Sequence, residues 1–325
     1  MADEVTVGID IGGTNTALGL VDREGRCVVL AEVPTLAEQD ARSLVTRLCD
    51  KVEELHRGLA EPPKIAGIGI GAPDANYYTG TVEHPPNLNW PGVTPLAALF
   101  RERFDVPVVV TNDANAAALG EMLFGAGRGI RDFIVITLGT GLGSGLVANG
   151  ELIYGADGFA GELGHTVVDP SGRQCACGKR GCLETYASAT GICRTVFELL
   201  CDSTDDSELR DVGFEDLTAE RVSEAALRGD KVALAAFEST GRVLGMKLAD
   251  AVAHTSPAAI ILVGGLAKAG DLIFVPTKRW MEEFLFHAFK GKVKLLRSGM
   301  PTGGDPAVLG AAALVWAELA KVRLS

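Results

Sequence analysis

Basic residues are scarce in this sequence: 30 lysines and arginines stand against 42 aspartates and glutamates, so the formal net charge is −12. A nucleic-acid-binding surface needs a basic face to neutralise phosphates, so this balance argues against a nucleic-acid partner. Long apolar runs are missing as well. The most apolar stretch, residues 258–266, is far shorter than a membrane span and contains two glycines. We therefore expect neither a nucleic-acid partner nor a membrane segment.

The chain also lacks the features of a secreted protein. Its N-terminus, MADEVTVGIDIGG, has neither the basic segment nor the apolar core of a signal peptide. Seven cysteines are an odd number for a disulfide framework, and a reducing cytoplasm fits them better. No low-complexity tract or Ser/Gly linker interrupts the 325 residues, and a chain of this length is expected to form about two domains. We expect the protein to be cytoplasmic.

What the chain does contain is a series of apolar strands and amphipathic helices. Strands are predicted at residues 5–12, 18–22, 27–34, 64–71, 106–113 and 258–265, and helices at 38–59, 114–124, 231–254 and 307–319. The opening pattern of strand, glycine turn and strand restarts at residues 132–153. This short echo suggests two related α/β halves, although glycine richness alone could also produce it.

The turn after the first strand, in DIGGTNT, offers Asp10, Gly12, Gly13, Thr14 and Asn15. Glycines let backbone N–H groups approach a phosphate without a blocking Cβ, and Asp10 could hold a magnesium ion through its waters. The stretch matches neither the P-loop pattern nor the dinucleotide pattern. Alone it is a weak signal, because glycine pairs are common in β-turns.

Two further glycine turns follow apolar strands. LGTGLGSG supplies Gly139, Thr140 and Gly141, and VGGLAKAG supplies Gly264 and Gly265. Three such turns in this order resemble the actin-like superfamily of sugar kinases and ATPases. That resemblance implies a ribonuclease H-like fold of two lobes, in which two phosphate loops clamp the nucleotide tail and the third lies beside the adenosine.

A carboxylate follows the strand in VVVTNDANAAA. Asp113 stands where this strand ends and a helix begins, with Asn112 beside it. One interpretation is a helix cap, a position that Asp commonly occupies. The other is a general base that takes a proton from an attacking hydroxyl during phosphoryl transfer. Both interpretations remain open at this point.

Four metal-ligating residues cluster in GHTVVDPSGRQCACGKRGC, namely His165, Cys175, Cys177 and Cys182. Their short spacings suit a tetrahedral Cys₃His zinc site. A C-x-x-C redox pair is absent, because one residue separates the first two cysteines. A nucleic-acid-binding finger would need a recognition helix and a net positive charge, and the sequence shows neither, since the chain carries a net charge of −12. The pattern favours a structural zinc site.

The same stretch, GELGHTVVDPSGRQCACGKRGCLETYAS, resembles the signature of the ROK family, which includes sugar kinases and sugar-responsive repressors. The resemblance extends over nearly the whole chain. It implies that Asp113 is the catalytic base facing the 6-hydroxyl of a hexose, and that zinc rigidifies the loop presenting its sugar-binding side chains. The sugar-binding residues that it implies are Asn87, Asn112, Asp113, Glu162, His165 and Glu184.

The resemblance also implies a domain organisation and a reaction. We expect a small lobe at residues 1–117, a larger lobe with the zinc loop at 118–305, and a terminal helix at 306–325 that returns to the small lobe. The expected reaction transfers the γ-phosphate of Mg-ATP to the 6-hydroxyl of glucose, and a homodimer is the usual form of such proteins. The expected cofactors are ATP, Mg²⁺ and a structural Zn²⁺.

Other functions compete with this one. An N-acetylhexosamine kinase or a fructokinase would keep the chemistry and change the sugar. A sugar-responsive repressor would need a helix-turn-helix domain ahead of the first strand, and a strand that begins near residue 5 leaves no room for it. A plain ATPase would leave the carboxylates around the cysteines unexplained.

Two stretches depart from the family pattern. Residues 71–92, GAPDANYYTGTVEHPPNLNWPG, stand where many members have G-x-P-G-x-V-D. This stretch borders the expected sugar pocket, so the choice of sugar stays open. Residues 299–314, GMPTGGDPAVLGAAAL, also differ. Because they belong to the terminal helix, we expect them to matter little for chemistry.

Overall fold

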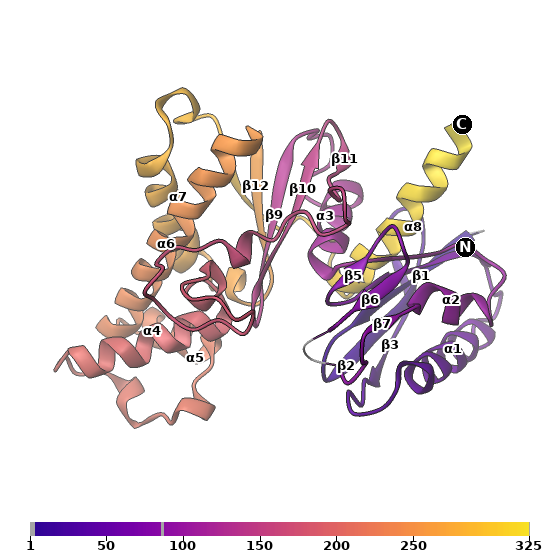
Figure 1. Cartoon of the computed structure of the whole chain (residues 1–325), viewed down its shortest axis with the longest axis horizontal. Helices are drawn as coiled ribbons and strands as arrows, with labels where there is room; N and C mark the ends of the chain where they lie inside the picture. Colours follow the sequence, from indigo (N-terminus) through magenta and orange to yellow (C-terminus); the bar gives the residue numbers. More distant parts are fainter. Residues whose placement is uncertain (1–3, 86–87, 325) are drawn as a thin grey trace.

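The computed structural model describes residues 4–85 and 88–324 and contains two five-stranded sheets (Figure 1). The first sheet has the order β3-β2-β1-β4-β8. Its strands are β1 (Glu4–Ile11), β2 (Asn15–Val21), β3 (Cys27–Pro34), β4 (Lys64–Gly71) and β8 (Val108–Thr111). The second has the order β11-β10-β9-β12-β13. Its strands are β9 (Phe133–Leu138), β10 (Leu142–Ala148), β11 (Glu151–Leu152), β12 (Ala259–Val263) and β13 (Lys294–Arg297).

The two sheets repeat one topology. In the first, β1 pairs antiparallel with β2 and parallel with β4; in the second, β9 pairs antiparallel with β10 and parallel with β12. The next strand outward is antiparallel on one side of each sheet and parallel on the other. The internal repeat predicted from the glycine-rich stretches is therefore confirmed at the level of topology.

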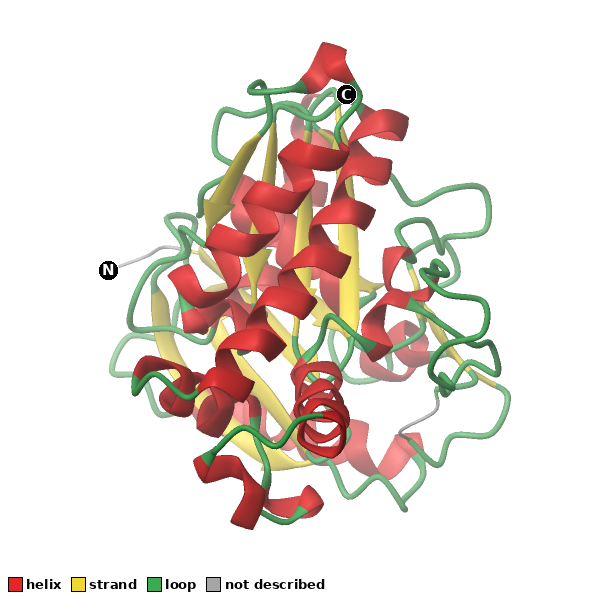
Figure 2. Cartoon of the chain, turned by 90° about the vertical axis from the view of Figure 1, so that its left-hand side faces the viewer, coloured by secondary structure: helices red, strands yellow, loops and turns green. Residues whose placement is uncertain are grey.

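Helices cover both sheets (Figures 1 and 2). Because both faces are covered, the central strands are apolar on both sides, whereas the edge strand β3 alternates between half-buried and exposed residues. On β9, Ile134 and Ile136 face one apolar core, while Phe133 and Val135 face another. The helices are α1 (Ala41–Arg57), α2 (Leu96–Arg101), α3 (Asp113–Leu123), α4 (Ala189–Asp202), α5 (Ala219–Leu227), α6 (Lys231–Thr255), α7 (Asp271–Phe284) and α8 (Pro306–Leu324).

The apolar cores assign these helices to layers. The core of the first sheet includes residues of α1 and α2, and the core on the far face of the second sheet includes residues of α4 to α7. Residues of α3 and α8 share a third core with strands of both sheets. The short segments are a third sheet of β5 (Ala75–Asn76), β6 (Thr81–Glu83) and β7 (Val93–Thr94), and the 3₁₀ turns η1 (Leu163–His165), η2 (Leu183–Thr185), η3 (Glu208–Asp211), η4 (Phe214–Asp216), η5 (Leu266–Ala269) and η6 (His287–Phe289).

Glycines within β1 and β4 let α8 lie directly on the first sheet. A Cβ added at Gly8 would approach the backbone oxygen of Val308 to 2.1 Å, and one at Gly69 would approach that of Ala311 to 1.9 Å. No side chain fits at such distances, so these glycines serve close packing. The terminal helix thus contacts the first sheet although about 235 residues separate it from β4 along the chain.

Most predicted elements are present with small shifts in their ends. The strands at 27–34 and 64–71 match β3 and β4, and the helices at 38–59 and 231–254 correspond to α1 and α6. No helix among the described residues is long and apolar enough to cross a bilayer.

Candidate functional site

Three parallel strands of the first sheet end side by side. Asp10 on β1 is in register with Gly71 on β4, which is in register with Thr111 on β8. A Cβ built at Gly71 would lie 3.4 Å from Oδ1 of Asp10 and 3.8 Å from Cα of Asp113. Since parallel strands present their carboxyl ends at one edge of a sheet, residues distant in sequence meet here. The edge therefore brings Asp10 and Asp113 together.

The helix cap at this edge is Asn112, and Asp113 is the first helical residue of α3. Oδ1 of Asn112 accepts a hydrogen bond of 3.0 Å from the backbone N–H of Asn115. The carboxylate of Asp113 accepts one of 2.8 Å from the N–H of Ala114. Because the capping position is filled by its neighbour, Asp113 is not needed as the cap. The amide nitrogen of Asn112 remains a free donor among the described residues.

The carboxyl groups at this edge have raised pKa values. Asp113 is open to solvent, yet it lies deep enough that surrounding protein displaces much of its hydration, and this desolvation raises its pKa. Burial, followed by the charges of Asp113 and Asp305, raises the pKa of Asp10 to about 7. Asp305 lies just before α8, so the segment expected to matter little for chemistry contributes a charge beside Asp10.

A loop from the second sheet carries the other predicted sugar-binding residues. Nε2 of His165 lies 4.0 Å from Oε2 of Glu162, and Nδ1 of His165 lies 3.6 Å from Oε1 of Glu184. Desolvation raises the pKa of Glu162, and Asp74, Asp113 and Glu184 add to the rise while His165 opposes it. Asp113, at the end of β8, lies close enough to Glu162 for its charge to affect the pKa of Glu162. The loop and the end of β8 therefore border a common space. Asn87, the remaining predicted sugar-binding residue, lies outside the described residues.

The four predicted metal ligands come together in the structure. The ligand atoms of His165, Cys175, Cys177 and Cys182 all lie within 4.8 Å of one another. Sγ of Cys177 and Sγ of Cys182 are 3.6 Å apart, and Sγ of Cys175 is 3.7 Å from Nδ1 of His165. Tetrahedral zinc, with bonds of about 2.0–2.3 Å, separates its ligands by about 3.3–3.8 Å. The donor set and its spacing therefore fit zinc.

A buried arginine anchors this loop. The guanidinium of Arg173 donates to Glu198 at 2.9 Å, to the backbone oxygen of Thr185 at 2.6 Å and to Oγ1 of Thr195 at 2.8 Å, and it lies over the ring of Tyr186. A buried charge with this many partners holds its surroundings firmly. Arg173 thus ties the cysteine loop to α4. The sequence offered no periodic or motif signal for this role.

The second and third glycine turns lie next to each other and next to the loop. Gly264 has φ +94°, and a Cβ there would approach the backbone oxygen of Leu138 to 2.7 Å. A Cβ at Gly141 would approach Oε2 of Glu184 to 2.8 Å, whereas Cβ atoms at Gly139 and Gly265 would meet nothing within 4 Å in the described chain. Open space in front of two glycines suits a bound ligand.

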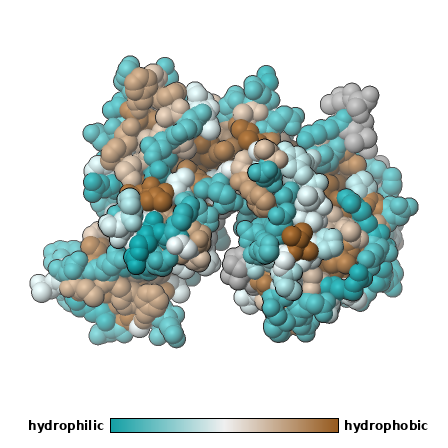
Figure 3. Space-filling model, viewed as in Figure 1, coloured by the Kyte–Doolittle hydropathy of each residue, from teal (hydrophilic) through white to brown (hydrophobic). Residues whose placement is uncertain are grey.

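The first glycine turn forms a separate part of the site. The N–H of Gly12 donates to the backbone oxygen of Asn15, while Thr35 bonds the backbone oxygens of Gly12 and Thr14. Gly13 is exposed between them. Among the described residues, no hydrogen bond links this turn to the other two. Figure 3 shows a hollow between the half that carries α4 to α7 and the half that carries β1 to β7.

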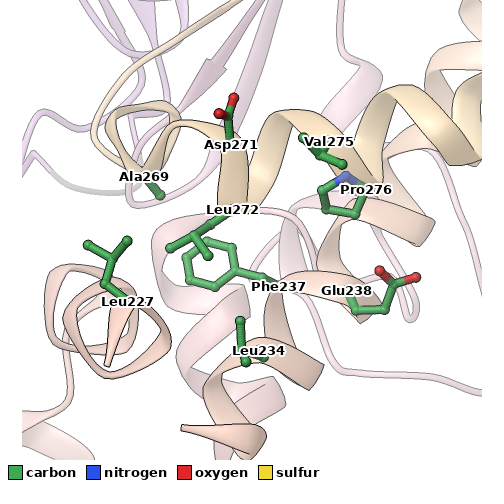
Figure 4. Close-up of a pocket in the computed structure, with 9 residues that line it drawn as sticks. All are labelled: Leu227, Leu234, Phe237, Glu238, Ala269, Asp271, Leu272, Val275 and Pro276. Atoms are coloured by element: carbon green, nitrogen blue, oxygen red, sulfur yellow. The ribbon is translucent and has the colours of Figure 1, made fainter. Parts of the chain in front are cut away.

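An apolar cavity of about 520 Å³ lies between α5, α6 and α7 (Figure 4). Phe237, Leu234 and Leu272 line it. The two carboxylates at its rim are engaged elsewhere, Glu238 with Trp280 at 2.7 Å and Asp271 with Arg297 at 2.7 Å. The cavity therefore offers an apolar surface and no free titratable group.

Comparisons with known proteins show what this chain is similar to. A glucokinase of Halalkalibacterium halodurans is 38% identical over 87% of this chain and 87% of its own. A xylose repressor of Caldicellulosiruptor bescii is 30% identical over 96% of this chain and 78% of its own. The crystal structure of a ROK family glucokinase from Streptomyces griseus, in complex with glucose and AMPPNP, superposes with a TM-score of 0.81 at 36% identity, covering 95% of this chain and 98% of that one.

This structural match confirms the predicted actin-like, ribonuclease H-like fold of two lobes. The family model itself matches residues 6–318, which is nearly the whole chain. The glucokinase covers 87% of this chain and the xylose repressor covers 96% of it. The chain therefore belongs to the ROK family.

Proposed function

We propose that this chain is an ATP-dependent glucokinase that phosphorylates the 6-hydroxyl of glucose. The observation that carries the proposal is the position of Asp113, a carboxylate with a raised pKa at the first turn of α3 that faces Glu162 and its loop. A general base works best when its pKa approaches the working pH. The glucokinase relatives and the glucose complex of a related structure support glucose as the acceptor.

In this proposal the two lobes divide the reaction. Asp113 accepts the proton of the attacking hydroxyl, and Asn112, Glu162, His165 and Glu184 orient the sugar. The glycine turns hold the phosphates through their backbone N–H groups, and a bound Mg²⁺ would neutralise charge on the transferred phosphoryl group. Closure over the hollow would exclude water, which competes with the sugar as acceptor.

Asp10 is the residue that we assign to the magnesium ion. A divalent cation favours the ionised carboxyl, and the pKa of Asp10 is about 7 because of burial and two neighbouring carboxylates. The dissociation constant of Mg-AMPPNP should therefore fall about tenfold between pH 6 and pH 8, as the ionised fraction of such a group rises. Calorimetry at several pH values measures it. A constant that is flat with pH, or one that keeps its slope in Asp10→Asn, would contradict this assignment.

The second glycine turn supplies a test of nucleotide binding. Gly139→Val places a branched side chain where the structure has open space, so the protein should fold normally while its KM for ATP rises at least about tenfold. Steady-state kinetics measures the change, with a melting curve to verify the fold. The control is Gly58→Val at the end of α1, on the surface of the small lobe. An unchanged KM for ATP in the Gly139 variant would remove this turn from the nucleotide site.

The cysteine cluster is assigned to one structural zinc ion. Its role is to hold the loop that carries Glu162, His165 and Glu184, because donors that cannot relax discriminate better among sugars. Nδ1 of His165 faces the cysteines and Nε2 faces Glu162, so one ring can serve both functions. No disulfide joins any of the seven cysteines, all of which the structure describes.

The rivals from the same family differ in their sugar or in their output. An N-acetylhexosamine kinase or fructokinase would prefer another acceptor, and a sugar-responsive regulator like the xylose repressor would bind sugar without turnover. ADP release across a panel of hexoses separates them, and turnover that is greatest with glucose would support the proposal.

The homodimer stays a prediction. Exposed apolar residues such as Leu227, of which 77% is accessible, are compatible with such a contact.

A further inference from the structure

Asp74 is a carboxylate at the candidate sugar site that the family pattern does not provide. In the stretch GAPDANYYTG it stands at the position of the second glycine of G-x-P-G. Its backbone has φ +51°, in the left-handed region. Glycine adopts this conformation without steric cost, while Asp and Asn only tolerate it. Glycine would adopt this backbone conformation at least as easily, so the backbone does not explain why an aspartate stands at this position.

The carboxylate of Asp74 has no partner within the described chain. It is half-buried, and no hydrogen bond or ion pair joins it to the described residues. Its backbone, by contrast, is held, since its carbonyl accepts a 3.0 Å hydrogen bond from the N–H of Glu83. Asp and Asn in turns usually bond their own backbone nearby. Asp74 does not, so a local structural role leaves its side chain unexplained.

The fold directs this segment toward the sugar site from both ends. Gly71, three residues before Asp74, lies against Asp10 and Asp113. Asn76, two residues after it, donates a 2.9 Å hydrogen bond to the backbone oxygen of Asp157, in the segment that leads to Glu162. Asp74 is thus held between the end of β8 and the sugar loop. In agreement, desolvation and then Asp113 raise its pKa, while His165 opposes them.

We propose that Asp74 is a substrate-contacting residue that sets which hexoses the acceptor site takes. This rests on the proposed kinase function. A carboxylate accepts a strong hydrogen bond from a sugar hydroxyl, and it attracts an ammonium group. With Asp113, Glu162 and Glu184 it gives the site several acceptors and an excess of negative charge. The substrate class is therefore a neutral hexose or a cationic amino hexose such as glucosamine, and anionic sugars are excluded.

The test compares Asp74→Asn with the wild type on glucose, glucosamine and N-acetylglucosamine at about pH 7, where much of an amino sugar is protonated. Asn tolerates the left-handed backbone and removes only the charge. We expect kcat/KM for glucose to fall about tenfold, mostly through KM, as one charge-assisted hydrogen bond is weakened. The ratio of kcat/KM for glucosamine to kcat/KM for glucose should fall at least about fivefold relative to the wild type. The corresponding ratio for N-acetylglucosamine to glucose should not fall. Glucuronate, tested as a competitive inhibitor, should bind more tightly to the variant.

Asp74→Gly is the matched variant for the backbone, because it restores the glycine of the family pattern. If Asp74 contacts the sugar, this variant should lower the glucosamine-to-glucose ratio of kcat/KM as Asp74→Asn does, with an unchanged melting temperature. The assignment would be overturned, with the kinase function intact, if both variants kept every wild-type ratio or lowered kcat/KM equally for all three sugars. A wild-type protein that phosphorylates no hexose would overturn both proposals.

Discussion

Asp113→Asn should lower kcat for glucose by about a hundredfold to ten-thousandfold, the range that general-base catalysis contributes. The amide is nearly the same size as the carboxyl but cannot take the proton of the 6-hydroxyl. Glucose affinity should change little, because the amide still fills the same position. Coupled ADP release measures kcat, and calorimetry measures glucose binding.

The variant should also fold as the wild type does. The hydrogen bond that Asp113 accepts comes from the adjacent N–H of Ala114, and an amide oxygen accepts it equally well. The capping interaction belongs to Asn112 and is untouched. As a control, Asp50→Asn, at an exposed position of α1, should leave kcat unchanged. Near-normal turnover in the Asp113 variant, with full structural integrity, would end its assignment as the base.

Cys177→Ala should release the zinc and weaken glucose binding by about tenfold to a hundredfold, with a much smaller effect on ATP. The purified wild type should contain about one zinc per chain, and the variant close to none. Cys177 is an exposed member of the cluster, so its truncation opens no cavity in the core. Without metal the loop becomes mobile, and the sugar must order it on binding.

The geometry explains why loss of zinc should weaken sugar binding more than nucleotide binding. The loop carries Glu162 and Glu184 on either side of the ligands, whereas most of the glycine-turn backbone lies outside it. Cys201→Ala, which removes an exposed cysteine on α4 outside the cluster, is the control. Elemental analysis and calorimetry give the two readouts. Absence of zinc from freshly purified wild type, or a zinc-free variant with unaltered glucose affinity, would remove the metal from the sugar site.

The predictions from sequence were best where the signal was local. The strand and turn of DIGGTNT, the apolar strand at residues 64–71 and the spacing of the three cysteines depend on neighbours along the chain. Hydrogen bonding within a turn, apolar burial along a strand and ligand spacing all act over a few residues. No prediction from the sequence covered helices α4, α5 and α7 or the small sheet of β5 to β7.

Tertiary structure decided which side chains meet. The sequence allowed Asp113 to be either a helix cap or a general base, and the structure assigned the cap to Asn112, whose Oδ1 accepts a hydrogen bond from the N–H of Asn115. Asp305 lies almost 300 residues from Asp10, and it affects the pKa of Asp10 because α8 returns to the first sheet. Asp74 reaches the sugar site because Gly71 and Asn76 are each held by a different part of the fold.

The sequence by itself therefore determined the strands, the glycine turns and the metal-binding pattern, because each depends on short-range bonding and burial. The shared site was decided only by the packed structure. Its charges come from the ends of parallel strands, a loop of the second sheet and the start of the terminal helix. Their proximity depends on how helices and sheets pack, and no single segment carries that information.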